Sequence, residues 1–178
     1  MIRPMDQVAS DWQKVRIVIP DDEPAVMSRS MAFRRLAGHD VRTYSTRPAG
    51  PVDLAERIRD CEIVINIRST TRFAADVLEK CPALRLISIW GTGTDHVDLT
   101  AAQVRGIRVT NTPGVSAVAV AEHTLALMMA VAKRTVQVDQ HVRQGGWPRA
   151  MVTQLRGKTL GLIGTGAIGR EVARLGAG

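Results

Sequence analysis

The chain has only two cysteines among its 178 residues, Cys61 and Cys81. They show no CxxC spacing and have no nearby histidine pair, so the pattern predicts neither a zinc site nor a disulfide framework. Isolated thiols are typical of a reducing compartment, where disulfides are rare. We therefore expect two buried free thiols, no bound metal and a cytoplasmic location.

Aromatic residues and long apolar runs are also scarce. Three Trp, one Tyr and two Phe are too few for a surface on which bases stack, and the basic residues behind the net charge of +7 are scattered. The charge favours anionic partners, but we rank nucleic-acid binding last and expect none. The N-terminal segment lacks the apolar run of a signal peptide, and Glu122 and His123 interrupt the most apolar segment, Val115 to Ala132. We therefore expect no membrane segment.

Short β-branched runs alternate with helix-like segments over the first two thirds of the chain. Strands separated by helical crossovers form parallel sheets, so this alternation predicts a doubly wound α/β unit. The predicted strands are residues 15–20, 40–45, 62–67, 84–90 and 107–112, and the predicted connecting helices are residues 25–36, 52–59, 74–79 and 99–104.

One longer helix should follow, beginning at Ser116 and ending at the pair Gly145-Gly146. A second α/β unit then begins with a predicted apolar strand at Gly157 to Gly164 and a helix after it. We expect the chain to hold only one strand and one helix of that unit, and the apolar residues of both to be exposed. These residues are Leu160, Leu162, Ile163, Val172 and Leu175.

The clearest motif is a GxGxxG sequence between this predicted strand and helix, at Gly164-Thr165-Gly166-Ala167-Ile168-Gly169. In this context the glycines allow a tight turn, a close approach of a pyrophosphate to the backbone, and close packing of helix on strand. The helix N-terminus adds free N–H groups for the diphosphate. The acidic residue that binds the ribose in such sites lies about 20 residues further on, a position outside the 178 residues of this sequence. The motif therefore does not distinguish NAD from NADP.

Two further motifs lie where predicted strands end, which is where open α/β sheets bind ligands. The first, Asn66 to Thr71, contains Arg68, whose planar guanidinium suits a carboxylate; a surface arginine at a strand end is equally compatible. Ser69 or Thr70 is an alternative N-cap for the next helix. The second, Gly91 to Asp98, has two glycines whose N–H groups can face a ligand. We interpret its His96 as a solvated or capping loop residue.

Four motifs together resemble the D-isomer-specific 2-hydroxyacid dehydrogenase family, which includes D-3-phosphoglycerate dehydrogenase. The motifs are NIRSTT, GTGTDHVD, NTPGVSAVAVAEH and GKTLGLIGTGAIGREVA. The resemblance implies a flavodoxin-like substrate domain at residues 1–112, an interdomain long helix at 113–148 and the truncated beginning of a Rossmann NAD-binding domain at 149–178. It also implies a homodimer as a possible assembly.

The resemblance also assigns roles to residues. Arg68, Ser69, Gly91 and Gly93 match positions that contact a small 2-hydroxyacid or 2-oxoacid. The positions that contact NAD are matched by Thr92, Gly164, Gly166, Ala167, Ile168 and Gly169. Position 167 is commonly basic in relatives, so alanine leaves only the backbone contact there.

The family's catalytic histidine, its carboxylate partner and the substrate-orienting arginine all lie in the C-terminal half of full-length members. We therefore expect no catalytic residue in this chain, and an oxidoreductase by descent that is inactive as an isolated chain. The alternative is a non-catalytic module that binds a small carboxylate or regulates a relative.

Overall fold

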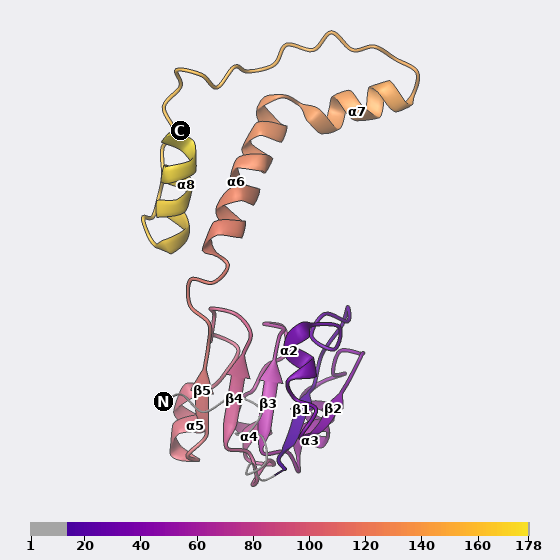
Figure 1. The fold of residues 1–178 in the computed structure, drawn as a ribbon, viewed down its shortest axis with the longest axis vertical. Helices are drawn as coiled ribbons and strands as arrows, with labels where there is room; N and C mark the ends of the chain where they lie inside the picture. Colours follow the sequence, from indigo (N-terminus) through magenta and orange to yellow (C-terminus); the bar gives the residue numbers. More distant parts are fainter. Residues whose placement is uncertain (1–13, 178) are drawn as a thin grey trace, which may run out of the picture. The chain divides into compact units, whose positions relative to one another are not determined.

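The structure is a computed structural model that describes residues 14–177. It divides into two compact units, Met1–Pro113 and Gly114–Gly178, which are described separately below. Figure 1 shows the strands confined to the first unit and helices as the regular structure of the second.

The first unit is built on a five-stranded sheet in the order β2-β1-β3-β4-β5, and each neighbouring pair is parallel. This is the strand order of flavodoxin-like folds, so the predicted fold class is confirmed. Each predicted strand is present but shorter than expected, because the flanking residues turn into loops. The strands are β1 (Arg16–Ile19), β2 (Asp40–Thr43), β3 (Ile63–Asn66), β4 (Leu86–Ile89) and β5 (Arg108–Thr110).

Three helices form one layer against this sheet: α3 (Pro51–Ile58), α4 (Ala75–Leu78) and α5 (Leu99–Val104). Helix α4 contacts both α3 and α5. The core between helices and sheet is apolar, and its most buried members include Ile58, Val64, Phe73, Leu78 and Ile87. This layer covers one face of the sheet, and ligands of open α/β sheets bind at the carboxyl ends of the strands.

The predicted helix at residues 25–36 is wrong over its first half, because only α2 (Met31–Arg34) is helical. The carboxylate of Asp22 accepts the backbone N–H groups of residues 26, 27 and 28, which holds this segment in a loop. Ser30 then caps α2, since its hydroxyl accepts the N–H of Phe33 at 3.1 Å. The hydrogen bonds to the Asp22 side chain therefore take the place of those that the first turns of a helix would make.

The second unit begins with two helices where the sequence predicted one: α6 (Ala117–Ala132) and α7 (Thr135–Arg143). The break lies at Arg134, whose φ of 53° is left-handed. The carbonyl of Ala132 accepts the N–H of Thr153 at 2.9 Å, so a distant segment takes the place of the next helical hydrogen bond. The predicted end is correct, because Gly145 adopts a φ of 81° after α7, as glycines that terminate helices commonly do.

The rest of the second unit is an extended segment followed by α8 (Ala167–Ala177), which packs against α6. The predicted strand at residues 157–164 is absent, because a strand needs a paired neighbour for its backbone groups and the described part of this unit has none. Leu160, Leu162 and Ile163 are exposed, as expected, but Val172 is 4% exposed beneath α6, so the prediction for that side chain is wrong. No helix in residues 14–177 is long and apolar enough to cross a membrane.

Both thiols, at Cys61 and Cys81, are free and buried in the first unit, as predicted. Burial raises the pKa of Cys61 to about 12 and that of Cys81 to about 11. A thiol must ionise to react, so we expect an aromatic disulfide reagent at pH 8 to label neither cysteine in the folded chain and both in urea. Rapid labelling of either cysteine without denaturant would contradict the structure.

Candidate functional site

A pocket of about 240 Å³ lies at the carboxyl ends of β3 and β4. Its walls are the two loops that follow these strands, and Figure 1 shows the strand arrows ending at the same edge of the sheet. The two loops begin side by side because Asn66 and Ile89, the last residues of the two strands, pair with each other. The pocket brings together all five predicted residues of the first unit: Arg68, Ser69, Gly91, Thr92 and Gly93.

Arg68 is held in place at one end of its guanidinium and free at another. Its Nη2 donates to the carbonyl oxygen of Pro24 at 2.7 Å, which fixes the side chain against the loop after β1. Its Nε is buried and donates to no acceptor among residues 14–177. A buried N–H without a partner is costly, so this geometry suits a carboxylate that would accept from it.

In the Gly91–Gly93 loop, the first two carbonyl groups accept hydrogen bonds from the described part of the chain, whereas the N–H groups do not donate to it. The carbonyl of Gly91 accepts from the backbone N–H of Thr112 at 2.8 Å, and that of Thr92 accepts from the Asn111 side chain at 2.7 Å. The loop is therefore anchored to the end of β5. Within residues 14–177, the N–H groups of Gly91, Thr92 and Gly93 donate to no acceptor, which makes them donors for an anionic ligand.

His96 is not the solvated or capping residue that the sequence suggested. Its side chain is 7% exposed, and its Nε2 lies 2.6 Å from Nδ2 of the buried Asn66. Burial lowers the pKa of His96, although nearby Asp95 acts in the opposite direction. Ser69 and Thr70 do not cap the next helix either, because α4 begins after Ala74 without a side-chain cap.

Sequence reasoning missed two buried carboxylates after β1, Asp21 and Asp22. Asp21 accepts the hydroxyl of Thr71 at 3.1 Å, and Asp22 accepts three backbone N–H groups of its own loop. The loop carries Pro24, the acceptor of Arg68. The sequence did offer a signal, because Asp21 and Asp22 follow the apolar strand β1. Polar residues at the carboxyl ends of parallel strands commonly belong to the ligand site.

Removing the Asp22 carboxylate by substitution with alanine should lower the free energy of unfolding by about 2 kcal/mol, because buried N–H groups lose their acceptor. Burial raises the pKa of Asp22, but its hydrogen bonds with Ser28, Val26 and Met27 together lower it below the ordinary 3.8. A lowered folded-state pKa gives stability that is present above the unfolded value and lost as pH falls through the folded value. Urea unfolding followed by Trp fluorescence should therefore show the full difference at pH 7 and a smaller one as pH falls below 3.8 through the lowered pKa of Asp22.

Asp22→Asn is the matched control, since its amide keeps one acceptor oxygen. We expect it to lose less stability than the alanine variant. Equal unfolding midpoints for wild type and Asp22→Ala at pH 7 would contradict the role given to this carboxylate.

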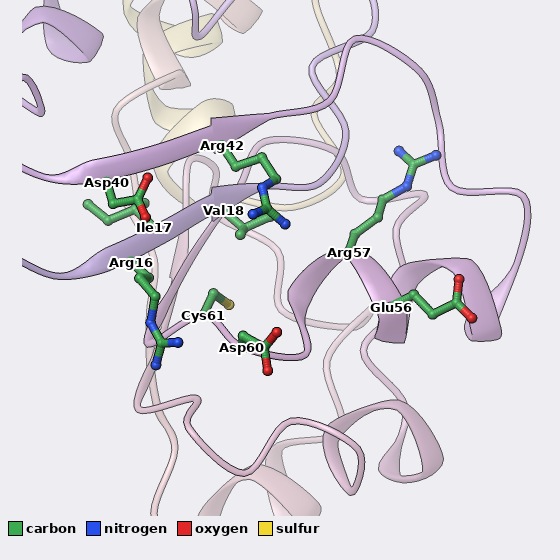
Figure 2. A pocket seen from close by; sticks show the side chains of 9 residues that line it. All are labelled: Arg16, Ile17, Val18, Asp40, Arg42, Glu56, Arg57, Asp60 and Cys61. Atoms are coloured by element: carbon green, nitrogen blue, oxygen red, sulfur yellow. The ribbon is translucent and has the colours of Figure 1, made fainter.

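A second cavity lies at the opposite edge of the sheet, among Arg16, Asp40, Asp60 and Cys61 (Figure 2). It measures about 40 Å³, which holds a water molecule or two and no organic acid. Figure 2 shows charged side chains of both signs around it. None of the predicted site residues lines this cavity, and we assign it no ligand. The residues 14–177 contain no group of three or more side chains able to hold a metal ion.

The GxGxxG segment of the second unit contains the turn and the helix start that its sequence predicts, although the strand expected before them is absent at residues 157–164. Gly164 has a φ of 92°, where side chains are strained. A Cβ at Gly169 would overlap the carbonyl oxygen of Gly164, so the helix start and the turn lie too close for any side chain. A Cβ at Gly166 would meet nothing within 4 Å, so the backbone there is open to a ligand.

Helix α8 begins within this motif, at Ala167. Its first hydrogen bond joins the N–H of Arg170 to the carbonyl of Gly166, so the N–H groups of residues 167–169 have no partner within the helix. Free N–H groups at the start of an 11-residue helix attract phosphate oxygens. Together with the open backbone at Gly166, this arrangement fits the pyrophosphate of a dinucleotide.

Residues 18–172 match the family described as D-isomer specific 2-hydroxyacid dehydrogenase, catalytic domain. The chain belongs to this family. It is 40% identical over 131 residues to the glyoxylate reductase of Korarchaeum cryptofilum, covering 70% of this chain and 39% of the relative. It is 42% identical over 123 residues to human D-3-phosphoglycerate dehydrogenase, covering 68% and 23%.

The fold is also similar to that of solved oxidoreductase structures. Aquifex aeolicus D-lactate dehydrogenase, complexed with NAD and lactic acid, aligns with a TM-score of 0.75 at 27% identity, over 91% of this chain and 48% of that one. An acyclic imino acid reductase in complex with NADPH and D-Arg gives 0.77 at 28%, over 91% and 52%. The chain thus spans less than half of the two curated relatives and about half of these structures.

Proposed function

We propose that this chain provides the substrate pocket and the pyrophosphate-binding loop of an oxidoreductase that interconverts a small D-2-hydroxyacid and its 2-oxoacid. One observation carries the proposal: the buried Nε of Arg68 has no protein acceptor in the described chain, in a pocket beside free backbone N–H groups. Such a pocket has donors for a carboxylate on two sides and no competing carboxylate among its lining residues. Family membership supports the reaction class.

In this proposal Arg68 binds the substrate carboxylate through its free guanidinium edge, and Pro24 holds the other edge still. Charge-assisted hydrogen bonds of this kind are about twice as strong as neutral ones. The N–H groups of Gly91 and Gly93 orient the same carboxylate, and the hydroxyl of Ser69 lies on the pocket wall. The bond from Nη2 to Pro24 limits how far the Arg68 side chain moves when the carboxylate reaches its buried Nε.

The dinucleotide is proposed to bind in the second unit, at Gly164, Gly166 and the first N–H groups of α8, at Ala167, Ile168 and Gly169. Thr92, in the first unit, is proposed as a cofactor contact from the family resemblance alone. NAD or NADP supplies hydride transfer when bound. The two solved relatives contain NAD in one case and NADPH in the other. Both therefore remain candidates, with NAD as the proposal from the sequence.

We also propose that the purified 178-residue chain binds without turnover. The chain has four histidines, and the one that lines the pocket, His96, is bonded through Nε2 to Asn66 and has a lowered pKa. Its Nε2 is therefore engaged with Asn66 rather than available for proton transfer toward the pocket. A non-catalytic module that binds small carboxylates is the second candidate, and the same engaged histidine favours it.

Three further assignments remain proposals. The substrate domain is residues 1–112, the interdomain segment 113–148 and the beginning of the cofactor domain 149–178. Exposed apolar side chains on α6, such as Leu127 and Val131, support a homodimer. The two free thiols support a cytoplasmic location.

Isothermal titration with NADH and NADPH tests the cofactor loop, and titration with oxamate, an unreactive analogue of a 2-oxoacid, tests the pocket. We expect both to bind, and no NADH oxidation when glyoxylate is added. Cofactor and oxamate binding together with turnover would contradict the proposed inactivity, whereas oxamate binding without any dinucleotide binding would favour the module. Binding of neither would overturn the proposed function.

A further inference from the structure

Asn66 and His96 form a buried side-chain pair in the wall of the pocket. Asn66 is the last residue of β3, and His96 lies in the loop after β4, 30 residues later. Their side chains connect the two loops that form the pocket walls, at a Nδ2 to Nε2 distance of 2.6 Å. Family resemblance assigns neither residue a role.

The surrounding hydrogen bonds determine which atom of the pair donates. The backbone N–H of Arg68 points to Oδ1 of Asn66 at 3.4 Å, so this oxygen is the acceptor and the amide N–H₂ faces His96. The Nε2 of His96 then accepts, which leaves the ring proton on Nδ1. A continuous series of contacts therefore runs from His96 through Asn66 to the backbone of Arg68.

The histidine itself is fixed by the backbone around it. Its carbonyl accepts the N–H of Phe73 at 2.8 Å, and the N–H of Asp98 returns to the carbonyl of Phe73 at 2.9 Å. The two segments also form a parallel β-bridge between Phe73 and Val97. The backbone that carries the imidazole is thus tied to the segment at Phe73, and the buried ring is held by its contact with Asn66.

We propose that Asn66 and His96 are a positioning pair that sets the backbone of Arg68 at a constant distance from the Gly91–Gly93 loop. A substrate carboxylate bound by both loops requires that distance to be constant, so the pair acts on substrate affinity through Arg68. This inference rests on the proposed function for its effect on binding. The tautomer and the link to Arg68 hold independently of any substrate.

Protonation of His96 would break the pair, because a charged ring presents an N–H to the amide N–H₂ of Asn66. Burial disfavours that charge, Asp95 favours it, and Arg72 disfavours it. The net lowering keeps the ring neutral down to pH values below its ordinary 6.5. Oxamate affinity should therefore be constant above that value and fall as pH decreases through the folded-state pKa.

The test compares two substitutions of His96. His96→Leu removes the acceptor, and we expect oxamate to bind about tenfold more weakly, as for one lost hydrogen bond. His96→Gln offers Oε1 to the same amide and should restore most of the affinity. The leucine variant should also lose the decrease in affinity that the wild type shows as pH falls below 6.5 through the lowered pKa of His96.

Two-dimensional ¹⁵N NMR provides readouts that do not depend on binding. The His96 ring of the wild type should show the Nδ1–H tautomer at pH 8, and the amide signal of Arg68 should shift in His96→Leu and return in His96→Gln. If the wild type binds no oxamate, the proposed function fails while these spectra still judge the pair. An Nε2–H tautomer, or an Arg68 signal unchanged in His96→Leu, would overturn the inference.

Discussion

Replacing Gly169 with alanine is expected to abolish dinucleotide binding by the chain. The added methyl would overlap the carbonyl oxygen of Gly164, so the start of α8 must move away from the turn. The N–H groups at the helix start would then no longer converge with the open backbone at Gly166. Isothermal titration with NADH should show no heat of binding, whereas the wild type binds.

Two other glycines serve as matched controls. Gly166→Ala meets nothing within 4 Å, so it should fold as the wild type does but bind the dinucleotide more weakly, since its methyl occupies the open face. Gly161→Ala also has free space and lies outside the motif, so neither folding nor binding should change. Wild-type affinity in Gly169→Ala would show that the loop does not hold the pyrophosphate.

Replacing Phe73 with alanine is expected to lower the free energy of unfolding by about 3–5 kcal/mol, as for other buried phenylalanines. The side chain is fully buried in the core of the first unit. A loss of this size is a large part of the roughly 5–15 kcal/mol that stabilises a typical domain. Urea unfolding followed by circular dichroism measures it.

The same substitution should also disturb the pocket, because the Phe73 ring lies beside His96. The Phe73 ring lies 6.5 Å from the His96 ring between centroids, and a cavity there lets the imidazole move. Phe73→Leu fills most of the space and should cost less stability. A loss below about 1 kcal/mol for Phe73→Ala would mean that the core contacts described for this ring are not made in solution.

The strands of the first unit were predictable because each is a β-branched run between turn signals, which is a local property. The carboxyl ends of parallel strands meet by necessity, and this allowed Arg68 and Gly91 to be placed at one edge of the sheet from the sequence alone. The predicted strand at residues 157–164 has the same kind of local pattern, but it lacks a neighbour in the described chain. Local pattern therefore predicts a strand only where the partner is present.

The pairing of Asn66 with His96 could not be predicted from the sequence. It depends on the register between β3 and β4 and on the path of a loop, neither of which is written in residue types. The helix prediction for residues 25–36 was partly wrong for a related reason. The segment has acceptable helix propensity, but the carboxylate of Asp22 accepts backbone N–H groups and holds its first half in a loop. Buried polar groups are where pattern reasoning was least informative.

The strand order has a consequence for how the chain assembles during synthesis. β1 and β2 pair first, β3 joins the free side of β1, and then β4 and β5 are each added beside the strand made just before. After β2 has paired on one side of β1, the sheet can thus grow on the other side alone as the ribosome releases the chain, without inserting a strand between two already paired. Both walls of the pocket then become complete only when β4 and its glycine loop arrive.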